Sequence, residues 1–142
     1  MAKGMEGHVI ICGYGVVGQK IAEQLSEHGI SFVIVELDQY KAEALMEQGY
    51  NVVRGDATKS SVLKSAGLET AKAIAAVLNE DAKNLFIVIT ARDIRKDIVI
   101  ASRANDEFVR EKLIEAGANH IVMPQITASK EIIREILKMR SR

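Results

Sequence analysis

The stretch VIICGYGVVG, residues 9–18, runs from four apolar residues into three glycines. The apolar run predicts a buried strand, and Val17, Ile21 and Leu25 recur at the spacing of a helix that packs on one side. The glycines fit the pattern G-x-G-x-x-G, which is a weak signal alone and a stronger one between a strand and a helix. The stretch therefore predicts a strand, a tight turn and a helix, the local arrangement that binds the phosphates of a nucleotide.

The three glycines have different expected tasks. Gly13 allows the tight turn, and Gly15 lets the backbone approach a phosphate at the N-terminus of the helix, where amide groups are free to donate. Gly18 lies on the same helical face as Ile21 and Leu25, so its missing side chain permits close packing of the helix on the sheet. The alternative is that the glycines only make a sharp turn.

The rest of the chain repeats the alternation of strand and helix. Amphipathic stretches of helical length separate apolar runs at residues 8–12, 31–36, 51–54, 73–77, 98–101 and 121–123. Continuous apolar strands that each feed a helix imply a parallel sheet covered on both faces, and right-handed crossovers make it doubly wound. We expect a single α/β domain with a Rossmann-like, six-stranded parallel sheet and helices on both faces.

Composition argues against several classes of protein. The 142 residues carry 19 basic and 19 acidic side chains, so no net charge attracts nucleic acid or an anionic membrane surface. No apolar run approaches the roughly 20 residues of a membrane span, so we expect no direct membrane insertion. The single Cys12 falls in an apolar run and no signal peptide precedes the first strand, so we expect an inert buried thiol and a cytoplasmic location.

An acidic residue ends the second predicted strand. In a dinucleotide fold, Glu36 at this point accepts hydrogen bonds from the ribose hydroxyls of the adenosine half and repels a 2′-phosphate, which argues against NADP. Leu37 and Asp38 follow directly and belong to the same candidate site. Asp38 is an alternative ribose ligand, although its place suits a helix cap better. The alternative for Glu36 is a solvated surface side chain.

A second acidic residue follows the third predicted strand, at the same carboxyl edge of the sheet. Asp56, with Ala57 beside it, is placed to bond the adenine amino group or neighbouring backbone. Thr58 is the expected cap of the next helix. A simple capping turn is the alternative for this segment.

Residues after the fourth and fifth strands complete the rim, because ligands bind outside the carboxyl ends of strands where the strand order reverses. Leu78 and Asn79 follow the fourth strand, and Arg103 ends the fifth. Arg103 is the best cationic candidate for a phosphate. Its alternative is a surface ion pair with Asp106 or Glu107.

Taken together, these residues resemble a known family. They are the Gly13–Gly18 turn, Glu36, the Gly55-Asp56 pair and the segment EAGANHIVMP, residues 115–124. The combination is similar to the regulator of potassium conductance (RCK) domain, also called the KTN or TrkA N-terminal domain, over nearly the whole chain. Members of that family are cytosolic domains or subunits of potassium channels, uptake systems and efflux antiporters. They form dimers and often octameric rings, bind NAD(H), ATP, ADP or AMP, and turn the bound ligand into movement of a gate.

The resemblance implies roles for particular residues. Residues 1–124 would form the nucleotide-binding lobe and residues 125–142 a crossover helix that docks on a second subunit. Many relatives continue into a C-terminal lobe that this sequence does not include. The expected phosphate contacts are Gly13, Tyr14, Gly15, Val16, Val17 and Arg103, with Glu36 as the ribose ligand and Asp56 and Ala57 beside the adenine.

No catalytic constellation accompanies the glycine turn. His8, His28 and His120 are scattered over different elements, so we expect neither a nucleophile with its base nor a metal cluster, although surface carboxylates leave a calcium site open. We therefore expect a nucleotide that is sensed and not consumed. Two alternatives stay open: the cofactor-binding domain of an NAD-dependent dehydrogenase without its substrate domain, and a scaffold that binds no nucleotide.

Two predicted helices carry more apolar surface than a sheet can cover. Residues 81–96 have apolar side chains on two faces, and the last helix carries an apolar stripe with no later element to pack on, formed by Ile132, Ile133, Ile136 and Leu137. We expect a homodimer, or a larger ring, to cover them, with a missing partner lobe as the alternative.

Overall fold

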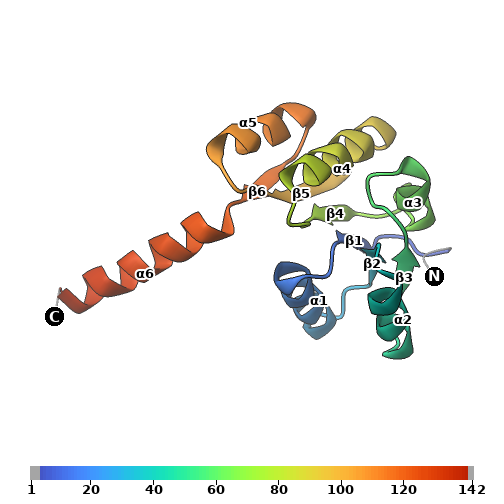
Figure 1. The fold of residues 1–142 in the computed structure, drawn as a ribbon, viewed down its shortest axis with the longest axis horizontal. Coiled ribbons are helices and arrows are strands. Elements are labelled where there is room, and N and C mark those ends of the chain that lie inside the picture. Colours follow the sequence, from blue (N-terminus) through green and yellow to red (C-terminus); the bar gives the residue numbers. More distant parts are fainter. Residues whose placement is uncertain (1–3, 141–142) are drawn as a thin grey trace.

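The computed structural model describes residues 4–140, which form a six-stranded parallel sheet with helices on both faces (Figure 1). Its strand order, β3-β2-β1-β4-β5-β6, is that of a doubly wound Rossmann-like sheet, as the alternating pattern predicts. The strands are β1 Val9–Cys12, β2 Phe32–Glu36, β3 Val52–Arg54, β4 Ala73–Ala76, β5 Val99–Arg103 and β6 His120–Val122. His120 thus begins the last strand, where the apolar pattern predicts a start at Ile121.

Helices cover the two faces of the sheet unequally. Helices α1 and α2 lie on one face and α3, α4 and α5 on the other (Figure 1). Ile11 packs with α1 and α2, whereas its neighbour Ile10 packs with the other three helices, because successive side chains of a strand point to opposite faces. The helices are α1 Val16–Glu27, α2 Gln39–Glu47, α3 Ser60–Ser65, α4 Asp81–Ile94, α5 Glu107–Ala116 and α6 Pro124–Arg140.

The strand order reverses at the middle of the sheet. β1 pairs with β2 on one side and with β4 on the other, and the chain leaves β1 and β4 toward helices on opposite faces. Loops that diverge in this way open a crevice at the carboxyl ends of the strands. The glycine turn follows β1 and Leu78 follows β4, so both lie at this point.

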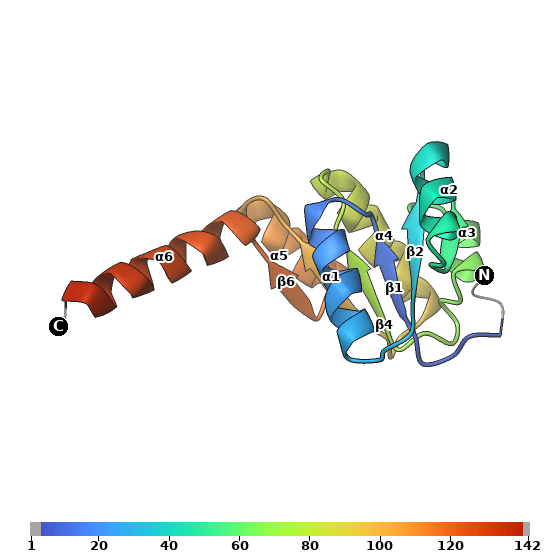
Figure 2. The same ribbon diagram turned by 90° about the horizontal axis from the view of Figure 1, so that it is seen from below.

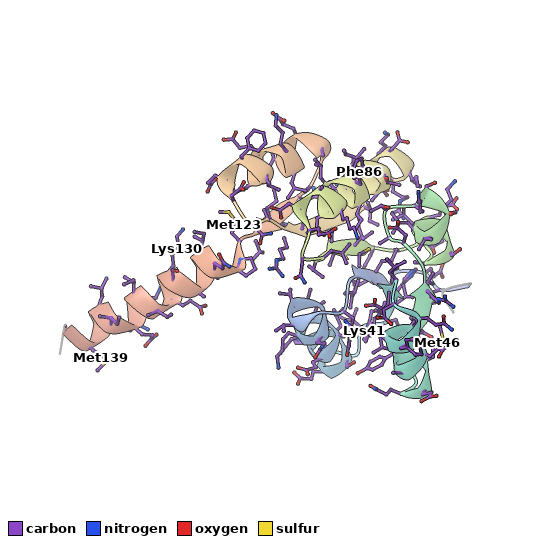
Figure 3. All side chains as sticks on the ribbon, in the orientation of Figure 1. Lys41, Met46, Phe86, Met123, Lys130 and Met139 are labelled. Atoms are coloured by element: carbon purple, nitrogen blue, oxygen red, sulfur yellow. The ribbon has the colours of Figure 1, made fainter. Side chains whose placement is uncertain are left out.

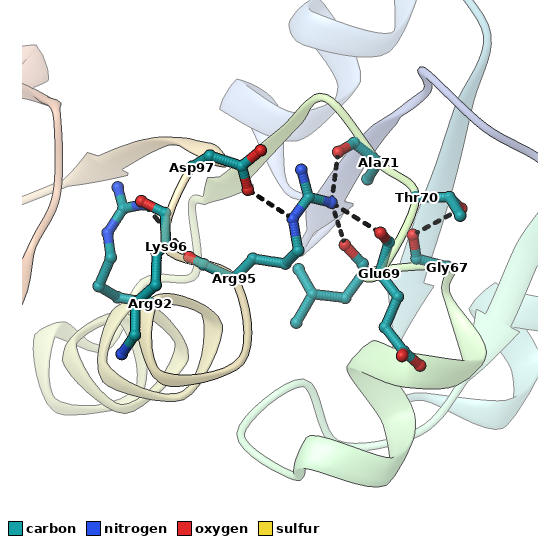
Figure 4. Close-up of polar contacts among 9 residues, drawn as sticks. Gly67, Glu69, Thr70, Ala71, Arg92, Arg95, Lys96 and Asp97 are labelled. Atoms are coloured by element: carbon teal, nitrogen blue, oxygen red, sulfur yellow. Dashed lines mark hydrogen bonds and ion pairs between the residues drawn. The ribbon is translucent and has the colours of Figure 1, made fainter.

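Arg95 holds the end of α4 to the loop before β4 (Figure 4). Its Nη1 donates hydrogen bonds to the carbonyl oxygens of Leu68 and Glu69, both at 2.9 Å, and of Ala71 at 3.0 Å. Its Nε donates to Asp97 Oδ1 at 2.8 Å. This guanidinium satisfies loop carbonyls that no strand pairs, so its role is structural.

A second arginine explains part of the EAGANHIVMP segment. Gly117 ends α5 with φ 111°, and a Cβ there would lie 2.8 Å from Cγ of Arg92. Arg92 Nη2 donates to Gly117 O at 2.8 Å and to Asn119 Oδ1 at 2.9 Å. The same Asn119 oxygen accepts the Ile100 N–H at 2.7 Å. Glycine at 117 is therefore required both by its backbone conformation and by the arginine packed on it.

Helix α6 extends away from the sheet (Figures 1 and 2). Every residue from Gln125 to Met139 is exposed, including the predicted apolar stripe of Ile132, Ile133 and Ile136. The prediction for α4 is confirmed in the same way, because one of its faces is buried while Phe86 on the other is 58% exposed. Phe86 points outward from α4, and Lys130 and Met139 stand clear of the domain (Figure 3).

Candidate functional site

The glycine turn connects β1 to α1 at the carboxyl edge of the sheet. Gly13 has φ 104°, which favours glycine, and its N–H donates to Val35 O of β2 at 3.2 Å. Helix α1 begins at Val16, and its N-cap, Gly15, has no side chain that could accept a first-turn amide. The first turn of α1 also lacks an acidic residue. Its amide groups and the positive end of the helix dipole are thus open to an anion.

Gly15 and Gly18 differ in the space around them, which agrees with the different tasks expected of them. A Cβ on Gly15 would meet nothing within 4 Å, and this residue is exposed, so the backbone can be approached from outside. A Cβ on Gly18 would collide with the carbonyl oxygen of Gly13, while its contact with Cγ2 of Ile11 in β1 would be an ordinary 3.7 Å. The close packing predicted for Gly18 is confirmed, but the Gly13 backbone limits it more tightly than the strand does.

The side chains of the turn differ in where they point. Tyr14 is half-buried, and its ring lies 6.3 Å from that of Tyr50, centroid to centroid. Burial, together with Tyr50, raises the pKa of Tyr14. Val17 is half-buried beside the same cluster, and Val16 is 76% exposed. Tyr14 therefore anchors the turn and presents mainly its backbone to the crevice.

Glu36 ends β2 and is half-buried at the carboxyl edge. Its Oε2 accepts the N–H of Asp38 at 2.9 Å, which orients the carboxylate. The helix-cap alternative for Asp38 is confirmed, because its Oδ1 accepts the N–H groups of Tyr40 and Lys41 at the start of α2. Leu37, between the two acids, is 59% exposed.

Asp56 binds its own loop, and Thr58 does not cap α3 as predicted. Asp56 Oδ1 accepts the Thr58 hydroxyl at 2.7 Å and the Thr58 N–H at 2.9 Å. These bonds, the hydroxyl first, hold the pKa of Asp56 below its ordinary value. The N-cap of α3 is Lys59, without a side-chain cap, because the acid has already drawn Thr58 into an Asx turn. Ala57 is buried beside it.

Arg103 does not form the surface ion pair with Asp106 or Glu107 that was the alternative to a phosphate contact. Asp106 is the N-cap of α5 and accepts Val109 N–H at 2.9 Å. Glu107 instead lies 3.8 Å from Arg110. Arg103 Nη1 donates to Asn79 Oδ1 at 3.3 Å, and its buried Nε has no partner within residues 4–140. The guanidinium at the end of β5 is thus held to the loop after β4 by Asn79, and its buried Nε–H makes no bond among those residues.

Sequence reasoning placed Asp81 on the rim but missed Asn84 and Asn105, which tie the two rim loops together. Asn84 of α4 is fully buried and bonds both the N–H and the C=O of Leu78, each at 2.9 Å. The carboxylate of Asp81 accepts the Asn105 N–H at 3.2 Å and its Nδ2 at 3.1 Å. An amide on a helix face that is otherwise apolar is a usable sequence signal, because buried polar groups require partners.

Other polar groups do not assemble into a reactive centre. His8 is buried and donates through Nε2 to Ala66 O at 2.8 Å, away from His28 in the C-cap of α1 and His120 in β6. Cys12 is buried at the end of β1, and burial raises its pKa to about 12, so the thiol stays protonated. Between residues 4 and 140 no group of three or more His, Cys, Asp or Glu side chains is arranged to hold a metal ion.

Two cavities of the molecule lie outside the glycine turn. One of about 850 Å³ lies along the outer strand β3 and is lined by residues such as Met5 and Val53, and one of about 660 Å³ lies between α3 and α4. Neither includes a residue of the glycine turn. The candidate site lies above the carboxyl ends of β1, β2 and β5. None of the helices in the described part of the chain is long and apolar enough to cross a bilayer.

Comparison with known proteins shows what this arrangement is similar to. A family model described as the TrkA-N domain matches residues 9–124. Potassium channel protein 1 of Methanocaldococcus jannaschii is 39% identical over 134 residues, and the match covers 93% of this chain and 40% of that protein. The voltage-gated potassium channel Kch of Escherichia coli is 30% identical, with coverage of 92% and 32%. The chain spans less than half the length of these curated relatives.

Solved structures agree with the family match. The TrkA-N domain of the Escherichia coli inner membrane protein ybaL superposes with a TM-score of 0.86 at 30% identity, over 96% of this chain and 98% of that one. The GsuK channel bound to NAD superposes with a TM-score of 0.78 at 28% identity, over 86% of this chain and 22% of that one. A structure of GsuK bound to ADP matches equally well.

Proposed function

The chain belongs to the TrkA-N (RCK) domain family, and from this premise we propose that it is a nucleotide-sensing regulatory domain of a potassium channel or transporter. One observation carries the proposal. The N-terminus of α1 is uncapped and open at Gly15, and Glu36 stands at the end of the neighbouring strand β2. Free N–H donors at a helix N-terminus, beside a carboxylate at the end of the adjacent strand, are the arrangement that holds the phosphate and ribose of a nucleotide.

We assign contacts to the ligand from this geometry. The N–H groups of Gly15 and the first turn of α1 bind phosphate oxygens, and Arg103 adds a guanidinium from the opposite rim. Glu36 accepts the ribose hydroxyls and disfavours the 2′-phosphate of NADP. Asp56 and Ala57 border the adenine. The ligand is then NAD(H) or an adenine mononucleotide, AMP, ADP or ATP. Nucleotide complexes of the similar GsuK channel support this range.

A sensing role agrees with the chemistry at the candidate site. The thiol next to the glycine turn stays protonated, and His8 is committed to a backbone carbonyl inside the fold. Binding without turnover then acts by population shift, and the nucleotide moves the equilibrium only by its differential affinity for two arrangements of the domain pair.

Pairing of the domains is part of the proposal. The exposed stripe on α6 is apolar at Ile132, Ile133 and Ile136, on a helix that leaves the body of the domain. We assign residues 125–142 as a crossover segment that docks on a second copy, with residues 1–124 as the nucleotide-binding lobe; residues 1–3, 141 and 142 of these ranges lie outside the described residues. The membrane-embedded partner is a potassium channel or transporter subunit, and this domain lies at the cytoplasmic face.

The proposal is tested by asking which nucleotide the purified protein holds. Denatured protein is analysed by mass spectrometry for released nucleotide, and the melting temperature of the emptied protein is measured with NAD, NADH, NADP, ATP, ADP and AMP. A ligand at 100 times its Kd adds about 2.7 kcal/mol to the free energy of unfolding. We expect a rise with adenine nucleotides and none with NADP. No rise with any of them overturns the proposal, and oxidation of a substrate by NAD would favour the dehydrogenase alternative.

A further inference from the structure

The loop between β4 and α4 is held by one buried side chain. Asn84 of α4 is inaccessible to solvent, and both ends of its amide bond the same residue. Its Oδ1 accepts the Leu78 N–H and its Nδ2 donates to the Leu78 carbonyl, each at 2.9 Å. This pair of bonds reproduces what a neighbouring strand would supply, at a point where β4 has already ended. Leu78 is therefore fixed by a side chain and not by the sheet.

Leu78 in turn lies against the glycine turn. A Cβ added to Gly13 would be 2.8 Å from Cδ2 of Leu78, so the two residues are in direct contact. The next residue, Asn79, accepts the hydrogen bond from Arg103. A displacement of Leu78 would therefore move one wall of the crevice together with Asn79, the hydrogen-bond partner of the Arg103 guanidinium.

Asn84 also reaches the second rim loop. Its Nδ2 lies 3.4 Å from the carbonyl oxygen of Arg103, the last residue of β5. The two loops are joined again at their outer side, where Asn105 Nδ2 donates to Asn79 O at 3.3 Å and to Asp81 Oδ1 at 3.1 Å. Asn84 is the one member of this set that is buried and contacts both loops from below.

We infer that Asn84 is a positioning residue for the nucleotide site, an inference that rests on the proposed function. It does not touch the nucleotide. Acting through Leu78 and the Arg103 carbonyl, it sets the separation between the glycine turn and the guanidinium that receives the phosphate. A nucleotide bridging the turn and the rim binds well only when that separation is held in advance, because ordering the loops on binding would cost affinity.

The substitution Asn84→Asp tests this with almost no change in shape. The introduced carboxylate still accepts the Leu78 N–H, but its second oxygen faces the carbonyls of Leu78 and Arg103 without a proton to donate. Protonation restores the donor, and burial raises the pKa of such a carboxyl. We expect nucleotide affinity about tenfold or more below that of the unchanged protein at pH 8, the size of a lost buried hydrogen bond, and recovery toward it at pH 5.

The measurement is isothermal titration calorimetry with NAD, ADP and AMP, expressed at each pH as the ratio of variant to unchanged Kd. The charged groups beside the position, Asp81 and Arg103, are present in both proteins, and the ratio compares the two proteins at the same pH. Asn84→Ser gives a second reading, because its hydroxyl is too short to bond both groups of Leu78 and has no charge to titrate. Its affinity should be lowered equally at pH 8 and pH 5.

A purely structural role for Asn84 predicts a different result. Leu113→Ala, on the buried face of α5, lowers stability without touching the rim and should leave affinity unchanged. If Asn84→Asp and Asn84→Ser lose stability as Leu113→Ala does but bind nucleotide as the unchanged protein does, the positioning role is overturned and the proposed function stands. If the unchanged protein binds none of the three nucleotides, the proposed function itself fails.

Discussion

The backbone of Gly18 in α1 lies directly against the Gly13 carbonyl of the preceding turn. A Cβ on Gly18 would collide with that oxygen and lie 3.0 Å from its carbonyl carbon. The first and third glycines of the motif therefore form one rigid unit, in which Gly13 makes the bend and Gly18 gives the helix room to return over it. Gly15 lies outside this unit, because nothing surrounds the position of its missing side chain.

Alanine at position 18 should therefore mainly lower stability, and alanine at position 15 should mainly lower nucleotide affinity. Gly18→Ala should lower the free energy of unfolding by about 1–3 kcal/mol, the usual cost of forcing a group into occupied space. Gly15→Ala should change it by less than about 1 kcal/mol, because its φ of −83° suits any residue, yet lower nucleotide affinity about tenfold or more. Chemical denaturation and calorimetric titration measure the two quantities. Equal loss of stability in both variants would contradict this division.

Glu36 should determine the preference for NAD over NADP. In Glu36→Gln the side-chain oxygen can still accept the Asp38 N–H, so the loop is kept while the charge that repels a 2′-phosphate is lost. We expect the NAD to NADP affinity ratio to fall by about tenfold, or about 1.4 kcal/mol.

Asp38→Asn is the matched control for that charge. It removes one negative charge two residues away, and asparagine is as good an N-cap for α2. The affinity ratio should then stay near that of the unchanged protein. A control that shifts the ratio as far as Glu36→Gln does would assign the discrimination to net charge and not to Glu36.

Cys12 should be unreactive while the protein is folded. Its pKa is raised to about 12 by burial, so below that pH the native thiol stays protonated and lacks the thiolate that attacks disulfide reagents. Labelling of Cys12 with a chromogenic disulfide should proceed at the unfolding rate in buffer and at once in denaturant. A change from pH 7 to pH 9 should speed the reaction of the native protein by less than it speeds that of the unfolded chain. Rapid native labelling would show that the end of β1 opens readily.

Thr58 should control the acidity of Asp56. Thr58→Val removes the hydroxyl that donates at 2.7 Å, the largest cause of the lowered pKa, so the pKa of Asp56 should rise toward its ordinary value. Because the pKa of Asp56 is lower in the folded than in the unfolded protein, its carboxylate stabilises the fold above the unfolded pKa. This stabilisation disappears as the pH falls through the folded pKa. A carboxyl-carbon NMR titration measures the shift. Thr58→Ser, which keeps the hydroxyl, should titrate like the unchanged protein.

The apolar stripe on α6 should hold the domain pair together. Ile133→Glu with Ile136→Glu places two charges in the stripe and should give a monomer, measured by light scattering after gel filtration. Thr127→Glu with Lys138→Glu, on the opposite face of the helix, should leave the assembly unchanged. The lobe lies apart from α6, so the monomer should keep its α/β fold by circular dichroism. If the protein with both changes in the stripe is still a dimer, the contact between the subunits lies on the exposed face of α4 instead.

The glycine turn and Glu36 could be predicted from sequence because their signals are local. A strand end, three glycines and a helix start lie within ten consecutive residues, and the next acid at a strand end follows from the same alternation. The partners of Thr58 and Arg103 could not. Thr58 satisfies Asp56 where a cap was expected, and Arg103 turns to Asn79 and not to the acids next to it in sequence.

The sequence by itself determined the alternation of strands and helices, the parallel doubly wound sheet, the carboxyl edge as the candidate site and the exposed apolar stripe of the last helix. Only the tertiary structure decided that Asn84 fixes Leu78 and reaches Arg103, and that Arg92 packs on Gly117. The hydrophobic periodicity of a helix or strand reflects which of its faces is buried, and residues close together in the sequence are enough to reveal it. A bond between Asn84 and Arg103, 19 residues apart, exists only because sheet order brings two loop ends within hydrogen-bonding distance.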